Sequence, residues 1–188
     1  MNRRIAIRNM ALILGSAVVL PSCLNDKKGN AVVQLKHLKL DADQENLVTN
    51  LAETILPKTD TPGAKDLGIN LFVFKMIDDC FTKEKQEEFM TGLKAFDDAV
   101  NDKYKKSFNE CTVAERTAFV NDIEQRSKAA KEKDSKDKDE VAAFYGMVKQ
   151  QTVFGYTTSQ YFMTKQIVYE LVPGRYNAMF PVKSSAVV

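Results

Sequence analysis

The 188-residue sequence has no tryptophan and a single histidine, His37. Zinc sites built from several histidines are therefore excluded, and a Ser-His-Asp triad would have to use that one residue. The chain also has no glycine-rich dinucleotide fingerprint, no phosphate-binding loop and no Cys-x-x-Cys-His motif for covalent haem. These absences argue against an independent dehydrogenase, a hydrolase or a haem protein, and we expect no cofactor in this chain.

The small positive charge gives no reason to expect a nucleic-acid partner. The formal charge of +2 comes from 27 basic and 25 acidic residues. Three of the basic residues and none of the acidic ones lie in residues 1–22, which leaves 24 basic against 25 acidic residues in the rest. A nucleic-acid-binding protein needs a basic surface, so we predict no nucleic-acid partner for this chain.

Residues 1–22 resemble an export signal. A start with three arginines is followed by an apolar run over residues 10–20 and then by "LPSC", which ends at Cys23. This order resembles a bacterial lipoprotein signal, in which Cys23 is acylated and becomes the N-terminus. The alternatives are an ordinary cleaved signal or a buried N-terminal helix, with Cys23 incidental. The paired arginines also resemble a twin-arginine signal, which exports folded proteins.

This interpretation divides the chain into three parts. Residues 1–22 are the expected signal, residues 23–40 a lipid-anchored tether, and residues 41–188 the folded domain. The expected location is the periplasm or cell envelope, with attachment to the membrane through the lipid on Cys23.

Helical patterns fill the domain. Asp41 and Gln44 form a capping-box pair, Thr82 is a suitable N-cap, and Thr112 with Glu115 forms a second box. Apolar residues recur at helical spacing after each of these signals. We therefore predict an all-α fold, a single compact domain of five or six helices.

Three local features complete this prediction. The last helical stretch begins at Val141, and Gly155 is expected to interrupt it. The acid pairs 78–79 and 97–98 lie on helices, where neighbouring side chains point in different directions. We therefore expect both pairs to be solvated.

Two cysteines follow the expected signal, Cys80 and Cys111. In an exported protein such a pair can form a disulfide. The alternative is two buried thiols that pack as small apolar residues.

One segment is specified more closely than a simple helix connection requires. Thr59, Asp60, Thr61, Pro62 and Gly63 are all turn-forming residues. The polar side chains can cap backbone N–H groups, the proline fixes φ, and the glycine permits a positive φ. The segment is either a rigid turn or a recognition loop positioned by its flanking helices.

The stretch "LAETILPKTDTPGAKDLGINLFVFKMIDDCF", residues 51–81, resembles the signature of the gluconate 2-dehydrogenase small (third) subunit family. Residues 155–181 are similar to the closing segment of that family, and residues 173–176, Pro-Gly-Arg-Tyr, match it well. The resemblance implies a non-catalytic accessory subunit of a membrane-associated sugar or sugar-acid dehydrogenase.

In such complexes a large FAD-binding flavoprotein removes the hydride, and a cytochrome c subunit or another acceptor takes the electrons. The resemblance thus implies FAD in the partner and a small subunit that carries the export signal and escorts its folded partner. The alternative function is a stand-alone helical envelope lipoprotein with a structural or interaction role.

The expected partner-binding residues are the turn at residues 59–63 together with Arg175 and Tyr176. Arginine and tyrosine are common interface anchors, because one offers a planar donor fork and the other apolar area with a polar tip. In the competing interpretation, Arg175 pairs with Asp60 inside the fold and clamps the C-terminal segment over the turn.

Overall fold

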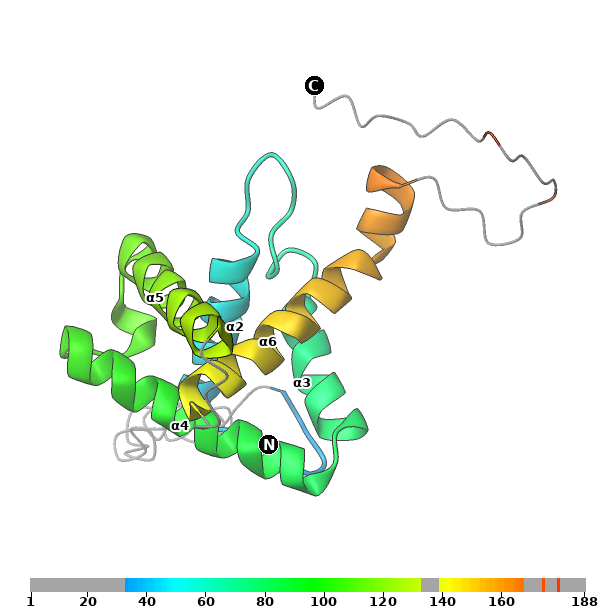
Figure 1. The fold of residues 1–188 in the computed structure, drawn as a ribbon. Helices are drawn as coiled ribbons and strands as arrows, with labels where there is room; N and C mark the ends of the chain where they lie inside the picture. The colour runs from blue at the N-terminus through cyan, green and yellow to red at the C-terminus, as the bar shows by residue number, and fades with distance from the viewer. Residues whose placement is uncertain (1–32, 133–138, 168–173, 175–178, 180–188) are drawn as a thin grey trace, which may run out of the picture.

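The described part of the chain is built from helices (Figure 1). The computed structural model describes residues 33–132, 139–167, 174 and 179. Its α-helices are α2 (Ala42–Ile55), α3 (Ile69–Cys80), α4 (Lys83–Tyr104), α5 (Val113–Glu132) and α6 (Glu140–Thr157). Two short helices are also present, the 3₁₀ helix η1 (Phe108–Glu110) and the π-helix η2 (Phe162–Gln166). These residues form no strand, which confirms the predicted all-α fold.

The core lies where α6 packs across α4 (Figure 1). The ring of Phe144 lies 5.1 Å from that of Phe89 and 5.4 Å from that of Phe96, and all three side chains are fully buried. Gly92 permits this approach, because a Cβ atom there would lie 2.6 Å from Cβ of Phe144. One glycine and three phenylalanines therefore fix how the two central helices pack.

The predicted capping signals lie at the helix starts. Backbone N–H of Gln44 donates to Oδ1 of Asp41 at 2.8 Å, and backbone N–H of Asp41 donates to Oε1 of Gln44 at 3.0 Å. Thr82 accepts a hydrogen bond from the backbone of Lys85 at 3.4 Å at the start of α4. These bonds satisfy N–H groups that have no partner inside the helix.

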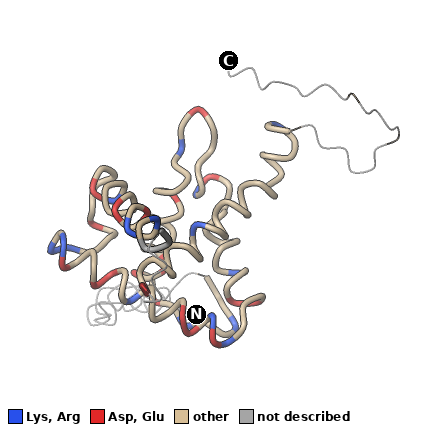
Figure 2. Tube along the Cα trace, in the orientation of Figure 1, with Lys and Arg blue, Asp and Glu red and all other residues tan. Residues whose placement is uncertain are grey.

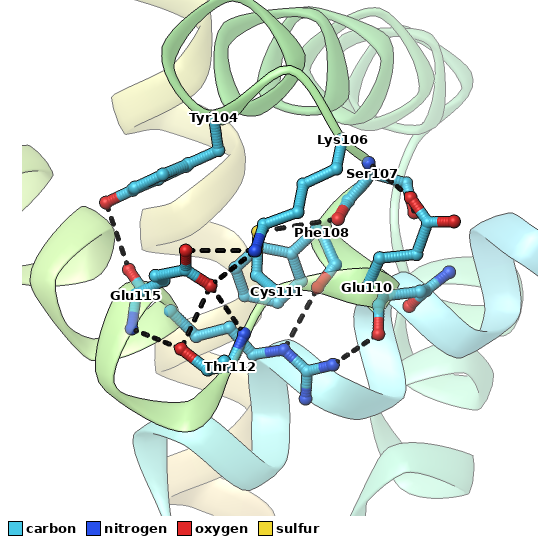
Figure 3. A network of polar contacts seen from close by, with 10 residues as sticks. Tyr104, Lys106, Ser107, Phe108, Glu110, Cys111, Thr112 and Glu115 are labelled. Atoms are coloured by element: carbon cyan, nitrogen blue, oxygen red, sulfur yellow. Dashed lines mark hydrogen bonds and ion pairs between the residues drawn. The ribbon is translucent and has the colours of Figure 1, made fainter.

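The second capping box belongs to a larger network between η1 and α5 (Figure 3). Backbone N–H of Thr112 donates to Glu115 at 2.7 Å, and Nζ of Lys106 donates to both carboxylate oxygens, at 2.9 and 2.8 Å. The hydrogen bond from Lys106, helped by those from Thr112, lowers the pKa of Glu115 from 4.5 to about 2. Arg116 adds hydrogen bonds to two carbonyl oxygens of η1, at 3.0 and 2.7 Å. The network fixes the direction in which α5 leaves η1.

The interruption expected at Gly155 lies three residues later, because α6 continues to Thr157 and residues 158–159 separate it from the helical residues that follow. A Cβ atom at Gly155 would lie 2.8 Å from the ring of Phe72 and 3.2 Å from Cγ2 of Ile69. The glycine therefore serves the close packing of α6 on α3 and does not end the helix.

Residues 33–38, which were expected to belong to the tether, lie against the helical body; we call them the strap. The carboxylate of Asp78 accepts hydrogen bonds from three successive backbone N–H groups of the strap, those of Lys36, His37 and Leu38, at 2.7, 2.8 and 2.8 Å. Leu38 is buried, whereas the side chain of His37 is exposed. The folded body therefore begins before residue 41.

The prediction of solvated acid pairs is wrong for Asp78, which is only 1% exposed. Burial alone would raise the pKa of Asp78, but the hydrogen bonds from the strap outweigh burial and hold the pKa below its ordinary value. Asp79 is exposed and pairs with Nζ of Lys36 at 2.9 Å. In the other pair Asp98 is exposed, whereas burial raises the pKa of Asp97.

Candidate functional site

The turn-forming segment lies between α2 and α3, in residues 56–68 (the α2–α3 loop). In Figure 1 this loop projects beyond the helices, on the side of the body toward which α6 also extends. Thr59 and Asp60 are exposed at its tip, whereas Gly63 and Ala64 are buried at its base. The loop thus presents a polar tip to solvent and packs its base on the core.

Both ends of the loop are held by one side chain, Glu53 in the last turn of α2. Its Oε1 accepts a hydrogen bond from backbone N–H of Lys58 at 3.3 Å, and its Oε2 accepts one from backbone N–H of Lys65 at 2.9 Å. Nζ of Lys65 in turn donates to Oδ1 of Asn50 at 2.9 Å. One carboxylate therefore joins residues on opposite sides of the tip.

Gly63 has a role other than the expected one. The sequence indicated that Gly63 permits a positive φ, but among the described glycines it is Gly68 that has one, at 65°, as the N-cap of α3. A Cβ atom at Gly63 would lie 2.7 Å from Oε1 of Glu53 and 2.7 Å from backbone N of Lys58. The glycine is needed because the Glu53 carboxylate occupies the space beside it.

The sequence indicated that Asp60 can cap a backbone N–H group of the loop, but a different aspartate does so. Asp66, not Asp60, accepts the hydrogen bond from backbone N–H of Gly63, at 3.3 Å, and pairs with Nζ of Lys58 at 3.1 Å. The hydrogen bond from Lys58 and that from Gly63 lower the pKa of Asp66. Asp60 forms no hydrogen bond or ion pair with the described residues. Its carboxylate is therefore available at the tip.

The two threonines of the turn hold its tip. Backbone N–H of Thr61 donates to Oγ1 of Thr59 at 3.3 Å, and backbone N–H of Thr59 donates to the carbonyl of Thr61 at 3.0 Å. Backbone N–H of Ala64 also reaches the carbonyl of Leu56, at 3.0 Å, across the base. The tip is thus a closed turn with its own hydrogen bonds.

Several predicted site residues lie outside the described part of the chain. They are Cys23, Arg175 and Tyr176. Gly174, beside Arg175, is described and exposed. The proposed pairing of Arg175 with Asp60 therefore remains a prediction.

Cys80 and Cys111 are both free thiols in this structure. Cys80 is exposed at the end of α3, whereas Cys111 is buried next to η1 and donates to the carbonyl of Ser107 at 3.4 Å. Burial raises the pKa of the Cys111 thiol. The two cysteines are therefore separate thiols in this structure and form no disulfide with each other. Only Cys111 is buried, so the alternative of two buried thiols holds for one of them.

Sequence reasoning did not assign the roles of Glu53, Lys65 and Asp66. The available signal was an acid in the last turn of α2, inside the stretch that carries the family resemblance. Among the described residues, no group of three or more histidine, cysteine, aspartate or glutamate side chains could hold a metal ion.

A known protein family matches most of the chain, the α2–α3 loop included. A family model described as gluconate 2-dehydrogenase subunit 3 matches residues 42–174, which is more than half of the chain. The chain belongs to the gluconate 2-dehydrogenase subunit 3 family. The match begins at the first residue of α2 and includes the whole α2–α3 loop. Comparisons with curated proteins and with solved structures gave no match.

Membership of the gluconate 2-dehydrogenase subunit 3 family places the chain among the subunits of a dehydrogenase complex. No helix in the described ranges combines the length and the apolar composition that a bilayer crossing requires.

Proposed function

We propose that this chain is the non-catalytic accessory subunit of an exported, membrane-associated dehydrogenase, and that it binds an FAD-containing large subunit acting on a sugar or sugar acid. Membership of a subunit family supports this proposal. Hydride removal and FAD are assigned to the large subunit because this sequence carries no dinucleotide fingerprint. A cytochrome c subunit is a further candidate partner as electron acceptor.

The observation that carries a binding role is the construction of the α2–α3 loop. Glu53, Asp66 and Gly63 hold its base, whereas the carboxylate of Asp60 forms no hydrogen bond or ion pair with the described residues. A loop fixed before binding loses little conformational entropy when a partner arrives. We therefore assign Thr59 and Asp60 to the contact with the large subunit, together with Arg175 and Tyr176.

Export and anchoring belong to the same proposal. Residues 1–22 serve as the signal that also brings the folded large subunit across the membrane, and the acylated Cys23 holds the complex at the surface. The ten residues from Cys23 to the start of the strap span at most about 33–36 Å when fully extended. A Cys23→Ser variant should remain an uncleaved precursor without lipid, as mass spectrometry of the N-terminal peptide will show.

The test compares two aspartates of the same loop. A tagged chain is extracted from membranes, and the flavin that co-purifies per chain is measured for Asp60→Ala and Asp66→Ala. Asp60→Ala should lower the flavin yield while the melting temperature stays unchanged, because Asp60 forms no hydrogen bond or ion pair with the described residues of its own chain. Asp66→Ala should lower the melting temperature, because Asp66 holds the base of the loop.

The outcomes separate the competing interpretations. If Asp60→Ala lowers the melting temperature and the flavin yield falls only in proportion, the loop is architectural and the docking role is wrong. If the wild-type chain brings down no flavoprotein at all, the stand-alone envelope lipoprotein becomes the better description.

A further inference from the structure

A cleft lies between the strap and the start of α4, beside the corner where α3 leads into α4 (Figure 1). Its volume is about 640 Å³. The strap and the residue after it line the cleft with residues 36–39, and α4 lines it with residues between 83 and 91. Three lysines but only one glutamate are among these lining residues, so the cleft carries an excess of positive charge.

Two of the three lysines have no acidic partner among the described residues. Lys36 pairs with Asp79 at 2.9 Å, whereas Lys39 and Lys83 are exposed and form no such ion pair. Figure 2 shows the blue of the strap beside the blue at the start of α4, with the red of neighbouring acids around them. The charges of Lys39 and Lys83 are therefore available to an anionic partner.

The acids at the start of α4 lie mainly on another side of the helix. Glu84 and Glu88 line a different cleft, which also includes Glu140 at the start of α6. Glu88 is in addition paired with Lys85, at 2.6 Å. Glu87 is the one acid of α4 that lines the cleft beside the strap. The strap side of α4 thus keeps its unpaired lysines apart from most of the acids.

The strap is also the place where the chain leads from the body toward Cys23. Its three hydrogen bonds to Asp78, the buried side chain of Leu38 and a hydrogen bond from backbone N–H of Val33 to Oε2 of Glu45, at 3.2 Å, hold it in place. Residues 24–32 include two lysines and one aspartate. A lipid on Cys23 would hold this side of the body within about 33–36 Å of the membrane.

The α2–α3 loop lies at the opposite end of α3. The strap bonds to Asp78 in the last turn of α3, whereas the loop ends at Gly68, the N-cap of that helix. The 12 residues of α3 rise about 18 Å along the helix axis. In Figure 1 the loop projects from the side of the body opposite the α3–α4 corner. A body that rests on a membrane by the strap therefore leaves the tip of the loop free.

We propose that the strap and the start of α4 form the membrane-facing surface of this chain, and that the partner of this surface is anionic phospholipid. Lys39 and Lys83 lie at the lipid phosphate groups, and the α2–α3 loop points away from the membrane toward the large subunit. Lysines close to an anionic membrane are attracted to it, and salt screens the attraction. The inference rests on the proposed anchoring at Cys23 and adds an orientation to it.

Cys80 is a native reporter of this surface. It is exposed at the end of α3, next to Asp79, which pairs with Lys36 of the strap. The full chain, extracted from membranes, is added to preformed vesicles of phosphatidylcholine, with or without phosphatidylglycerol. A neutral maleimide too large to cross the bilayer then labels the thiol. Phosphatidylglycerol should slow the labelling of Cys80 about tenfold, and high salt should restore the rate.

Charge variants test which side chains cause the protection. Lys39→Gln combined with Lys83→Gln should abolish the protection of Cys80, because neutral side chains are not attracted to the lipid phosphates. Lys58→Gln, in the α2–α3 loop, is the matched control and should leave the protection unchanged. Protection that survives the double substitution would contradict the proposed surface.

A second thiol tests the orientation of the body. Val113→Cys in a Cys80→Ser background places a thiol at a 74% exposed position at the start of α5. This position follows the far end of α4, whose 22 residues span about 33 Å. Its labelling should be equally fast in both kinds of vesicle. Protection of this thiol by phosphatidylglycerol would show that another face meets the membrane.

The outcomes distinguish the orientation from the anchor on which it rests. A chain that associates with both kinds of vesicle but shows equal labelling of Cys80 contradicts the membrane-facing surface alone. A chain that associates with neither contradicts the anchoring in the proposed function, and the orientation with it.

Discussion

A Cβ atom on Gly63 would lie 2.7 Å from Oε1 of Glu53, so this glycine and this carboxylate occupy adjoining space. They are ten residues apart, one in the last turn of α2 and the other at the base of the α2–α3 loop. The absence of a side chain at one position therefore lets the other reach the two backbone N–H groups that it binds.

Gly63→Ala should destabilise the fold by about 1–3 kcal/mol, because the added methyl group must displace Glu53 or the backbone of Lys58. Gly146→Ala is the control, since no heavy atom lies within 4 Å of its added Cβ and it lies inside α6. That change should stabilise the fold by about 0.5–1 kcal/mol. Urea unfolding measures both, and a Gly63→Ala chain as stable as wild type would contradict the close approach.

Asp78→Ala should lower the free energy of unfolding by about 2–4 kcal/mol, because three backbone N–H groups of the strap lose their shared acceptor. Asp79→Ala, which removes only an exposed ion pair with Lys36, should cost less than about 1 kcal/mol. Similar losses for the two variants would contradict the distinct roles of these neighbours. Limited proteolysis should also cut the strap faster in Asp78→Ala.

The helices were predictable from sequence because the signals that define them are local. Asp41 lies three residues from Gln44, and Thr112 lies three residues from Glu115, so each capping box can be read within one turn. The partners of Asp78 lie about 40 residues away along the chain. No sequence pattern of helical period reports such a contact, and Asp78 was therefore misassigned to solvent.

Stability in acid should depend on Glu115. Its pKa in the folded chain, about 2, lies below its ordinary value of 4.5, so the carboxylate stabilises the fold above 4.5. This contribution is lost as the pH falls from 4.5 through 2. The difference in melting temperature between wild type and Glu115→Gln should therefore shrink over that range. A difference that stays constant would contradict the ion pair with Lys106.

Thiol labelling should distinguish the two cysteines of the domain. Without reductant, an alkylating reagent should modify Cys80 in the native chain and reach Cys111 only after unfolding, because the latter is buried. Peptide mapping locates the label. If both thiols react only after reduction, the chain contains a disulfide and the free-thiol arrangement is wrong.

The candidate site was predictable in position but not in construction. The density of turn-forming residues located the α2–α3 loop, since such residues act over a few neighbours. The sequence could not show which acids hold the base of the loop. Glu53 does so because the backbone of Lys65 folds back to its carboxylate, and Asp66 does so because it lies beside Gly63 and Lys58. Asp60 and Asp66 are the same residue type in one loop, and only the fold shows which of the two carboxylates is bonded to the described residues.

Native mass spectrometry of the tagged complex, extracted from membranes, tests the accessory-subunit role most directly. The account predicts one copy of this chain bound to one larger polypeptide that carries FAD, and a separately expressed chain without flavin. A flavin that stays with the isolated chain, or a native chain that carries no larger partner, would contradict the account.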